Sequence, residues 1–324
     1  MRRRNFIALL GGAAGWPLAA HAQQLVPVIG FLSPVSPDGS VDNLRAFQRG
    51  LKETGYVEGE NVAIVQRHAD NRIDRLPSLA AELVRKRVNL ILANSSAAFA
   101  AKSATKAIPI AFIVAEDPVR TGLVASLARP GGNLTGVNFV SAELVAKRLE
   151  LLRDLLPRAS RIALIVNPAQ VARAETTLRD LHAAADTLGL QVQVFNATTS
   201  QEVNAAFAAM AQQRSDALFV GNDPFFSSRR VQIVQLAARH GLPAIYPGRQ
   251  YPEIGGLISY GTDSMEAWRQ AGAYAGRILK GTKPAELPVM QASKFELVIN
   301  AETARMLGVA VPAPMLTAAD EVLE

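Results

Sequence analysis

Short apolar runs alternate with amphipathic stretches along this 324-residue chain, and this alternation restricts the possible fold more than any other feature. Runs such as Val28–Leu32 and Leu90–Ala93 have the length and composition of buried strands. The stretches between such runs, for example Asp42–Thr54, repeat apolar residues with helical spacing. Because strands that alternate with helices of this length form parallel βαβ units, the pattern predicts an α/β fold.

The alternation occurs twice, over residues 28–114 and again over residues 142–246, which predicts two doubly wound parallel-sheet lobes. Glycine-rich segments at 129–136 and 255–261 mark the joints between the two sets. A chain that crosses between lobes several times forms a hinge, so we expect a multi-crossing hinge here. The predicted lobes are residues 25–137 with 263–290, and residues 138–262 with 291–324. The predicted hinge residues are Thr135, Gly136, Val137, Asn138, Tyr260 and Gly261.

The first 22 residues have the pattern of an export signal. Three arginines at positions 2–4 precede an apolar stretch at 6–20, and Ala20-His21-Ala22 supplies a small-residue cleavage site. The apolar stretch is shorter than the roughly 20 residues that span a bilayer, which disfavours the alternative of a membrane anchor. Arg3-Arg4-Asn5-Phe6-Ile7 also resembles a twin-arginine signal. We therefore expect a protein that is exported to the periplasm and is soluble after cleavage.

Composition excludes several classes of function. The chain has no cysteine, which rules out disulfides, thiolate metal sites, thiol nucleophiles and an N-terminal lipid anchor. The leader holds three of the 34 basic residues and no acidic one, so the remaining chain is near charge balance. Its basic residues are dispersed, which disfavours a nucleic-acid partner. The sequence lacks the glycine-rich phosphate loops, the GxSxG elbow and metal-ligand histidine spacing, so we expect no catalytic residue, cofactor or metal.

Polar and aromatic residues gather at the predicted carboxyl ends of the strands, where open α/β sheets bind ligands. Two such edges that face each other across a hinge describe a cleft for a small solute. The candidate ligand-binding residues are Ser33, Asn94, Ser95, Ser96, Asp117, Asn167, Asp223, Phe225, Tyr246 and Tyr260.

Each candidate also has a structural interpretation. The segment 94–96 suits a helix cap, Asp117 and Asp223 precede proline as in turns, and Tyr246 and Tyr260 suit a core with a tethered hydroxyl.

These candidates predict an amino acid or a related amide as the solute. The helix start at Ser95 and Ser96 would bind its carboxylate, and Asp117 or Asp223 would bind its ammonium group. Aromatic residues in a predicted loop beside Asp223 would cover an apolar or ring-bearing side chain. Because the predicted cleft offers no arginine or lysine, a doubly anionic solute is disfavoured.

Several segments together resemble a known family. In chain order they are Ile108-Pro109-Ile110, Asp117-Pro118-Val119, 129–137, 255–261, 283–289 and 294–300. This set resembles the family of exported ABC-transporter substrate-binding proteins that includes tryptophan-binding members. The resemblance implies a type I periplasmic-binding fold, delivery of a solute to an inner-membrane ABC permease, and no catalysis. Since the family's lipid-anchor cysteine is absent, it further implies a free periplasmic protein, which we expect to be a monomer.

An enzyme on the same doubly wound scaffold, acting on a small metabolite, is the alternative from another class. The missing phosphate-binding loops count against it. A ligand-sensing regulator of the repressor type would share the two lobes. It would need an N-terminal DNA-binding helical pair, where this chain has an export signal instead.

Overall fold

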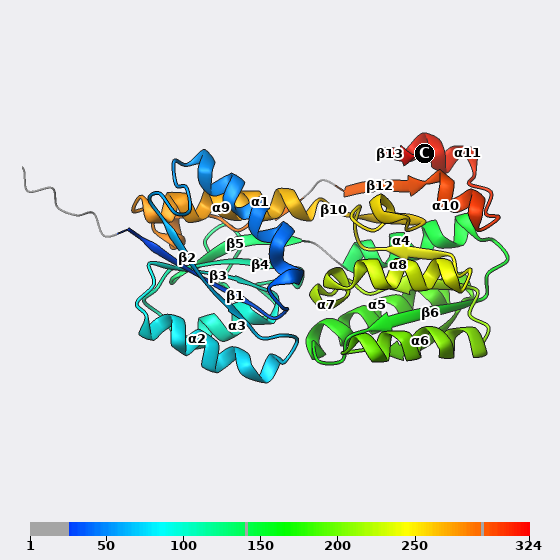
Figure 1. Ribbon diagram of the computed structural model, residues 1–324, viewed down its shortest axis with the longest axis horizontal. Helices are drawn as coiled ribbons and strands as arrows, with labels where there is room; N and C mark the ends of the chain where they lie inside the picture. The colour runs from blue at the N-terminus through cyan, green and yellow to red at the C-terminus, as the bar shows by residue number, and fades with distance from the viewer. Residues whose placement is uncertain (1–25, 140–141, 293–294) are drawn as a thin grey trace, which may run out of the picture.

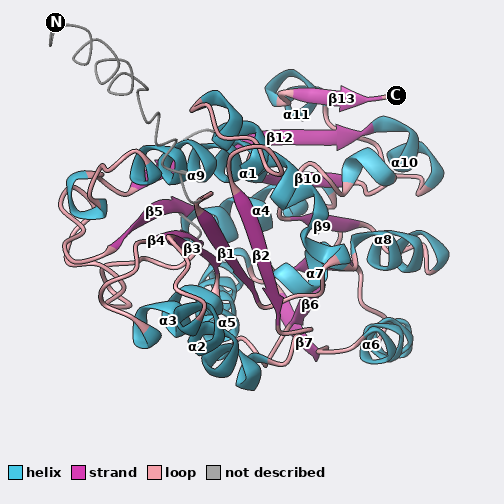
Figure 2. Cartoon of the chain, turned by 60° about the vertical axis from the view of Figure 1, so that its left-hand side comes forward, coloured by secondary structure: helices cyan, strands magenta, loops and turns pink. Residues whose placement is uncertain are grey.

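The computed structural model of the protein describes residues 26–139, 142–292 and 295–324. The export signal predicted over residues 1–22 therefore lies outside the described residues. The chain forms two lobes that lie side by side, each built on one sheet (Figure 1). Figure 2 shows helices on both sides of the strands, so the predicted fold of two doubly wound α/β lobes is confirmed.

The first lobe contains a six-stranded parallel sheet in the order β11-β5-β4-β3-β1-β2. Its strands are β1 (Val28–Ser33), β2 (Ala63–His68), β3 (Leu90–Asn94), β4 (Ile110–Val114), β5 (Leu134–Phe139) and β11 (Met290–Ala292). Its helices are α1 (Val41–Glu53), α2 (Leu76–Arg85), α3 (Ser96–Ala104) and α9 (Ser264–Leu279), with short 3-10 turns at Asp38–Ser40, Ile73–Arg75 and Pro284–Glu286.

The second lobe contains a seven-stranded sheet in the order β13-β12-β10-β9-β8-β6-β7, in which β12 runs antiparallel to β10. Its strands are β6 (Arg161–Val166), β7 (Gln191–Asn196), β8 (Ala217–Val220), β9 (Ala244–Tyr246), β10 (Ile258–Thr262), β12 (Phe295–Asn300) and β13 (Glu321–Leu323). Its helices are α4 (Ala142–Leu155), α5 (Val171–Leu188), α6 (Ser200–Gln212), α7 (Pro224–Ser228), α8 (Arg230–Arg239), α10 (Ala301–Met306) and α11 (Ala313–Ala318), with a 3-10 turn at Pro252–Ile254. No described helix is long and apolar enough to cross a bilayer.

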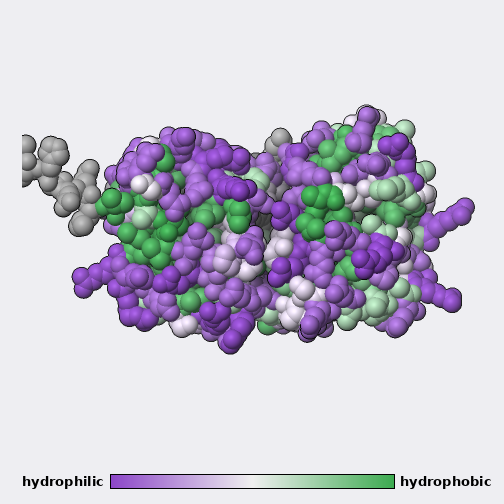
Figure 3. Space-filling model, in the orientation of Figure 1, coloured by the Kyte–Doolittle hydropathy of each residue, from purple (hydrophilic) through white to green (hydrophobic). Residues whose placement is uncertain are grey.

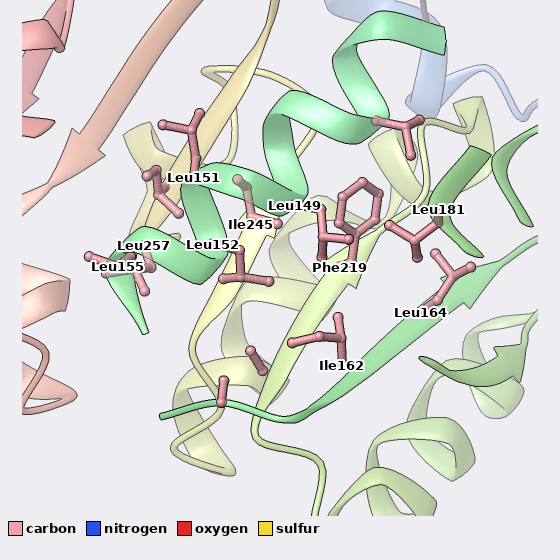
Figure 4. Close-up of a cluster of buried hydrophobic side chains, with 14 of the residues drawn as sticks. Leu149, Leu151, Leu152, Leu155, Ile162, Leu164, Leu181, Phe219, Ile245 and Leu257 are labelled. Atoms are coloured by element: carbon pink, nitrogen blue, oxygen red, sulfur yellow. The ribbon is translucent and has the colours of Figure 1, made fainter. Parts of the chain in front are cut away.

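The central strands of each sheet are buried on both faces, which explains why these strands are continuous apolar runs. Along β3, Leu90 and Leu92 pack with α1 and α9, while Ile91 and Ala93 pack with α2 and α3. In the second lobe, α4 and α5 cover one face and α6, α7 and α8 cover the other. Figure 4 shows leucines of α4 packed over Phe219 and its neighbours on the first of these faces.

The chain passes from one sheet to the other after β5, β10 and β11. The predicted hinge residues do not lie in these connections: Thr135 to Asn138 belong to β5, and Tyr260 and Gly261 belong to β10. The domain boundaries predicted after residues 137 and 290 accordingly fall inside β5 and β11, which are strands of the first sheet. Two of the connections, at residues 140–141 and 293–294, lie outside the described residues.

Close packing explains the glycines that suggested a hinge. A Cβ atom at Gly136 would overlap the carbonyl oxygen of Phe112, and one at Gly261 would overlap that of Pro247. Both glycines therefore let neighbouring backbone approach within one lobe. The hydroxyl of Thr135 also stays within its own lobe, where it donates to the carbonyl of Leu287 at 2.7 Å.

Helices α1 and α9 pack with their backbones nearly in contact over the first sheet. A Cβ atom at Gly50 would overlap the carbonyl of Arg269, and one at Gly272 would overlap that of Phe47. This close approach brings α9 onto the sheet next to the lobe boundary. Trp268 of α9 is buried there and meets the ring of Phe31 edge-on, at 5.9 Å between centroids.

We predict that Gly272→Ala lowers the free energy of unfolding by about 1–3 kcal/mol, because the added methyl group forces α1 and α9 apart. Urea denaturation measures the loss. Lys52→Ala on the exposed side of α1 is the control and should change stability by less than about 0.5 kcal/mol. Equal stability of Gly272→Ala and the parent protein would contradict the close helix contact.

The carboxylate of Asp216 ties the start of β8 to the start of β6. It accepts hydrogen bonds from the backbone N–H groups of Ser160 and Arg161, at 3.0 and 2.8 Å, and pairs with the Arg161 guanidinium at 3.1 Å. Burial acts to raise the pKa of Asp216, but the hydrogen bonds from Arg161 and Ser160 outweigh it and lower the pKa to about 2.

A carboxyl group whose pKa is lowered by folding stabilises the native state at pH values above its unfolded pKa of 3.8. That stabilisation is lost as the pH falls through 3.8 toward 2. We predict that Asp216→Asn is less stable than the parent protein at pH 5–7 and that the difference shrinks below about pH 4. Thermal unfolding of both proteins between pH 2 and 7 tests this, and a difference independent of pH would refute it.

Candidate functional site

A cleft of about 700 Å³ lies between the two lobes at the carboxyl ends of their strands. Figure 3 shows the indentation where the lobes meet, bordered by mostly hydrophilic surface. The first lobe contributes residues from α1, from the ends of β3 and β4, and from the start of α9. The second contributes the start of α5, the segment around α7, and the loop after β9. The predicted cleft at facing sheet edges is therefore present in the structure.

Arg173 in the first turn of α5 reaches across this cleft from the second lobe. Its guanidinium pairs with Glu116 at 2.9 Å and donates to the hydroxyl of Ser95 at 3.0 Å, both in the first lobe. It also donates to the backbone carbonyl of Asn222 at 3.0 Å. The side chains of Arg173 and Glu116 are each only 11% exposed. The expectation of a cleft without arginine or lysine was wrong, since Arg173, Arg45, Arg49, Arg230 and Arg249 line it.

One sequence signal could have pointed to Arg173. A cation in the first turn of a helix opposes the helix dipole, so an arginine there calls for a compensating partner. The partner is Glu116, which follows β4 on the other lobe and which only the tertiary structure brings near.

Ser95 lies between β3 and α3 in a strained backbone conformation. Its φ of 52° and ψ of −134° are rare for a residue with a side chain. The backbone N–H of Ser95 donates to Ile113 of the neighbouring strand β4 at 3.0 Å. Strain of this kind gathers at ligand-binding and switch sites, and here it accompanies the contact of the Ser95 hydroxyl with Arg173.

The neighbours of Ser95 differ in where they lie. Asn94 lines the cleft, is 6% exposed, and its Oδ1 accepts no hydrogen bond among the described residues. Ser96 does not line the cleft. It lines a separate apolar groove between α2 and α3, because the first turn of α3 rotates its side chain away from the lobe boundary.

The remaining polar candidates take part in the structure of the lobes. Ser33 is buried, contacts the hydroxyl of Ser40 at 3.1 Å and accepts from the N–H of Val35. Asn167 donates to Asp223 at 3.1 Å, and Asp223 also caps α7 through the N–H of Phe225 at 2.8 Å. Neither Ser33, Asn167 nor Asp223 is among the residues that line the cleft.

Asp223 is 3% exposed, and burial raises the pKa of its carboxyl group against the opposing effect of nearby Arg173. Asp117 is exposed and accepts from the N–H groups of Val119 and Arg120, at 2.8 and 3.0 Å. The turn before proline therefore accounts for Asp117.

The aromatic candidates lie mostly in the core. Phe225 belongs to helix α7 rather than to a loop and is buried with its neighbour Phe226. Tyr246 is buried against Tyr251, with 4.7 Å between ring centroids, and burial raises its pKa. Tyr260 lines a smaller cavity beside the cleft. Among the described residues, the aromatic side chain that lines the cleft is Trp268, which was not among the predicted residues. A tryptophan in an amphipathic helix has the same sequence pattern whether it lies in a core or in a cleft.

Further contacts join the lobes on either side of Arg173. Arg230 at the start of α8 pairs with Asp42 of α1 at 2.7 Å. Asn71, in the loop after β2, accepts from Asn167 at 3.2 Å and donates to the carbonyl of Thr198 at 2.5 Å. The lobes are thus in contact around the cleft. Among the described residues no group of side chains is suited to hold a metal ion.

A family model described as ABC transporter substrate binding protein matches residues 28–323. The chain belongs to this family. It is therefore a binding protein and not an enzyme, and the resemblance found in the sequence is confirmed. The tyrosine-binding protein of Clostridioides difficile (strain R20291) is 32% identical to this substrate-binding protein over 265 residues, which are 81% of this chain and 75% of that protein.

Two solved structures, each 28% identical, cover 92% of this chain and 99% of their own. The ABC domain from Streptococcus pneumonia in complex with L-Trp matches with a TM-score of 0.80. The ligand-free, open structure of a substrate binding protein with adhesive properties from Clostridium difficile matches with a TM-score of 0.62. The fold is the two-lobed type I periplasmic-binding fold, and the whole chain matches the L-Trp complex more closely than it matches the open structure.

Proposed function

We propose that this substrate-binding protein binds an amino acid with an aromatic side chain in the cleft and delivers it to an ABC permease of the inner membrane. The protein acts in the periplasm as a monomer, after removal of the export signal predicted over residues 1–22. The proposal is carried by one observation, which is that two features occur in the same cleft. The buried guanidinium of Arg173 bridges the lobes, and the ring of Trp268 lines the wall. The tyrosine-binding relative and the L-Trp complex support the same class of solute.

The polar end of the solute lies at the start of α3. Its carboxylate is bound by the hydroxyl of Ser95, the residue that precedes α3, and by the positive charge of Arg173, both of which line the cleft. Its ammonium group donates to the Oδ1 of Asn94, a buried acceptor with no other partner among the described residues. This arrangement replaces the earlier expectation that Asp117 or Asp223 binds the ammonium group.

The apolar end of the solute lies against α9 and the end of β4. Trp268, Met265 and Ile113 line the cleft here, and Trp268 is held in place by its edge-on contact with Phe31. Aromatic rings prefer edge-to-face or offset stacking, which an indole or phenol ring would find on Trp268. A cleft of about 700 Å³ holds such a solute together with ordered water.

Calorimetry with a panel of solutes tests the proposal directly. L-Trp, L-Tyr and L-Phe should bind more tightly than L-Leu, and L-Glu should not compete. Tryptamine lacks the carboxylate and indole-3-propionate lacks the ammonium group, so both should bind at least about tenfold more weakly than L-Trp, the loss of one hydrogen bond to a charged group. If no aromatic amino acid binds, or if L-Leu binds as well as L-Trp, the proposed solute class is wrong.

We predict that Trp268→Leu weakens binding of the preferred aromatic amino acid by about 0.5–1.5 kcal/mol, roughly two- to twelvefold, because one aromatic contact is lost. Affinity is measured by calorimetry. Tyr246→Phe is the matched aromatic control: Tyr246 is buried in the core away from the cleft, so this variant should retain the parent affinity. If Tyr246→Phe weakened binding and Trp268→Leu did not, the solute would instead be assigned to Tyr246 and Tyr251 of the second lobe.

We predict that Asn94→Ala weakens binding by about 1.5–3 kcal/mol, the range for a hydrogen bond to a charged group. Asp117→Asn should leave affinity unchanged, because the Asp117 carboxylate is occupied by its own turn. Calorimetry on both variants shows whether Asn94 or Asp117 binds the ammonium group. A loss of affinity in Asp117→Asn with none in Asn94→Ala would restore the assignment to Asp117.

A further inference from the structure

A second, smaller cavity of about 40 Å³ lies at the boundary of the lobes, next to the cleft. Arg148 of α4 lines it and is 2% exposed. The guanidinium of Arg148 lies 4.2 Å from the centroid of the Phe219 ring and donates to the carbonyl of Val220 at 3.1 Å. Among the described residues it forms no salt bridge, and its Nε has no hydrogen-bond partner. Burial lowers the pKa of Arg148 to about 9, so it remains a cation at neutral pH.

Glu116 brings a negative charge to the same cavity from the opposite lobe. Its Oε1 pairs with Arg173 at 2.9 Å, and its buried Oε2 accepts no hydrogen bond from the described residues. The backbone of Glu116 is anchored in the first lobe, where its carbonyl accepts from the Asn138 side chain at 2.8 Å. Asp180 of α5 also lines the cavity, but it belongs to the second lobe and is paired there with Arg179.

The charges of this cavity depend on how the lobes are arranged. Arg148 and Arg173 stay in the second lobe in any arrangement, whereas Glu116 pairs with Arg173 and lines the cavity with Arg148 only when the lobes are together. A buried cation without a counter-charge is costly, so the approach of Glu116 stabilises the closed arrangement. Glu116 does not line the 700 Å³ cleft, and it reaches the proposed solute contacts only through its pair with Arg173.

We propose that Glu116 is a positioning residue, a counter-charge shared by Arg148 and Arg173 that shifts the protein toward the closed arrangement and thereby sets its affinity for the solute. In a two-state protein the apparent affinity rises with the fraction of molecules already in the binding-competent state. Only the affinity part of this inference rests on the proposed function, because lobe closure can be measured without any solute.

The absence of cysteine in the chain makes closure directly measurable. Ser78→Cys in α2 and Ala205→Cys in α6 place one dye on an exposed position of each lobe (Figure 1). Single-molecule energy transfer between the dyes then reports the closed fraction without solute. Glu116→Gln should lower the closing constant about tenfold or more, since it removes the first-lobe carboxylate that pairs with Arg173 and lines the cavity with Arg148. Glu82→Gln, which breaks the pair with Arg67 inside the first lobe, is the control and should leave closure unchanged.

A double-mutant cycle separates charge pairing from a general loss of structure. In the Arg148→Met background, Glu116→Gln should change the closing constant by a factor at least about threefold smaller than in the parent protein. The variant Glu116→Asp keeps the charge on a shorter side chain and should give an intermediate closed fraction. Equal closed fractions for the parent protein and Glu116→Gln, or identical effects in both backgrounds, would overturn the proposal.

The affinity arm uses L-Trp as the probe. Its dissociation constant should rise in Glu116→Gln by the factor by which the closed fraction without solute falls, while the energy transfer at saturating L-Trp stays at the parent value. If L-Trp does not bind the parent protein but Glu116→Gln still opens the lobes, the solute assignment fails and the role of Glu116 stands. If L-Trp binds and its affinity is unaffected by Glu116→Gln, the role of Glu116 is refuted and the solute assignment stands.

Discussion

The contact of Arg173 with Glu116 and Ser95 is the interaction on which the site depends. It joins two lobes that otherwise have separate cores, and it does so where the strands of both sheets end. With both partners only 11% exposed, the ion pair is shielded from water and from salt more than the outer pair of Arg230 and Asp42. Burial of a charge is costly unless the charge is paired. The pair of Arg173 and Glu116 therefore favours the closed cleft, and loss of either partner would favour the open one.

The two ends of the cleft differ in polarity because they are formed by different structural elements. The polar end is made where β3 turns into α3, and the strain at Ser95 is a cost that the surrounding strands and Arg173 offset. The apolar end is made by α9, whose glycine contact with α1 brings Trp268 close to the lobe boundary. A solute with a charged head and a flat ring matches both ends, which is the chemistry that the L-Trp complex and the tyrosine-binding relative also share.

Several candidate residues were correct in their position along the chain but not in their role. Every one follows a strand or lies in one near its carboxyl end, yet the side chains of Ser33, Asp117 and Asp223 are used by nearby backbone groups and that of Tyr246 by the core. Polar residues at strand ends serve both turns and ligands, and the two uses need the same residue types. Sequence pattern therefore could not distinguish the cleft-lining Asn94 and Ser95 from their structural neighbours.

The sequence by itself determined the two α/β lobes, the alternating strands and helices over residues 28–114 and 142–246, the cleft at the facing sheet edges and the family. It could do so because hydrophobic periodicity and turn residues are local properties, and the family motifs are read in order along the chain. The tertiary structure alone decided that Arg173 crosses to Glu116, that Trp268 lines the cleft, and that Gly136 and Gly261 let neighbouring backbone pack closely within one lobe. These facts join residues far apart in the chain. The free energy that stabilises these contacts comes from burial and from charge pairing across the lobe boundary. A local sequence pattern contains no information about either.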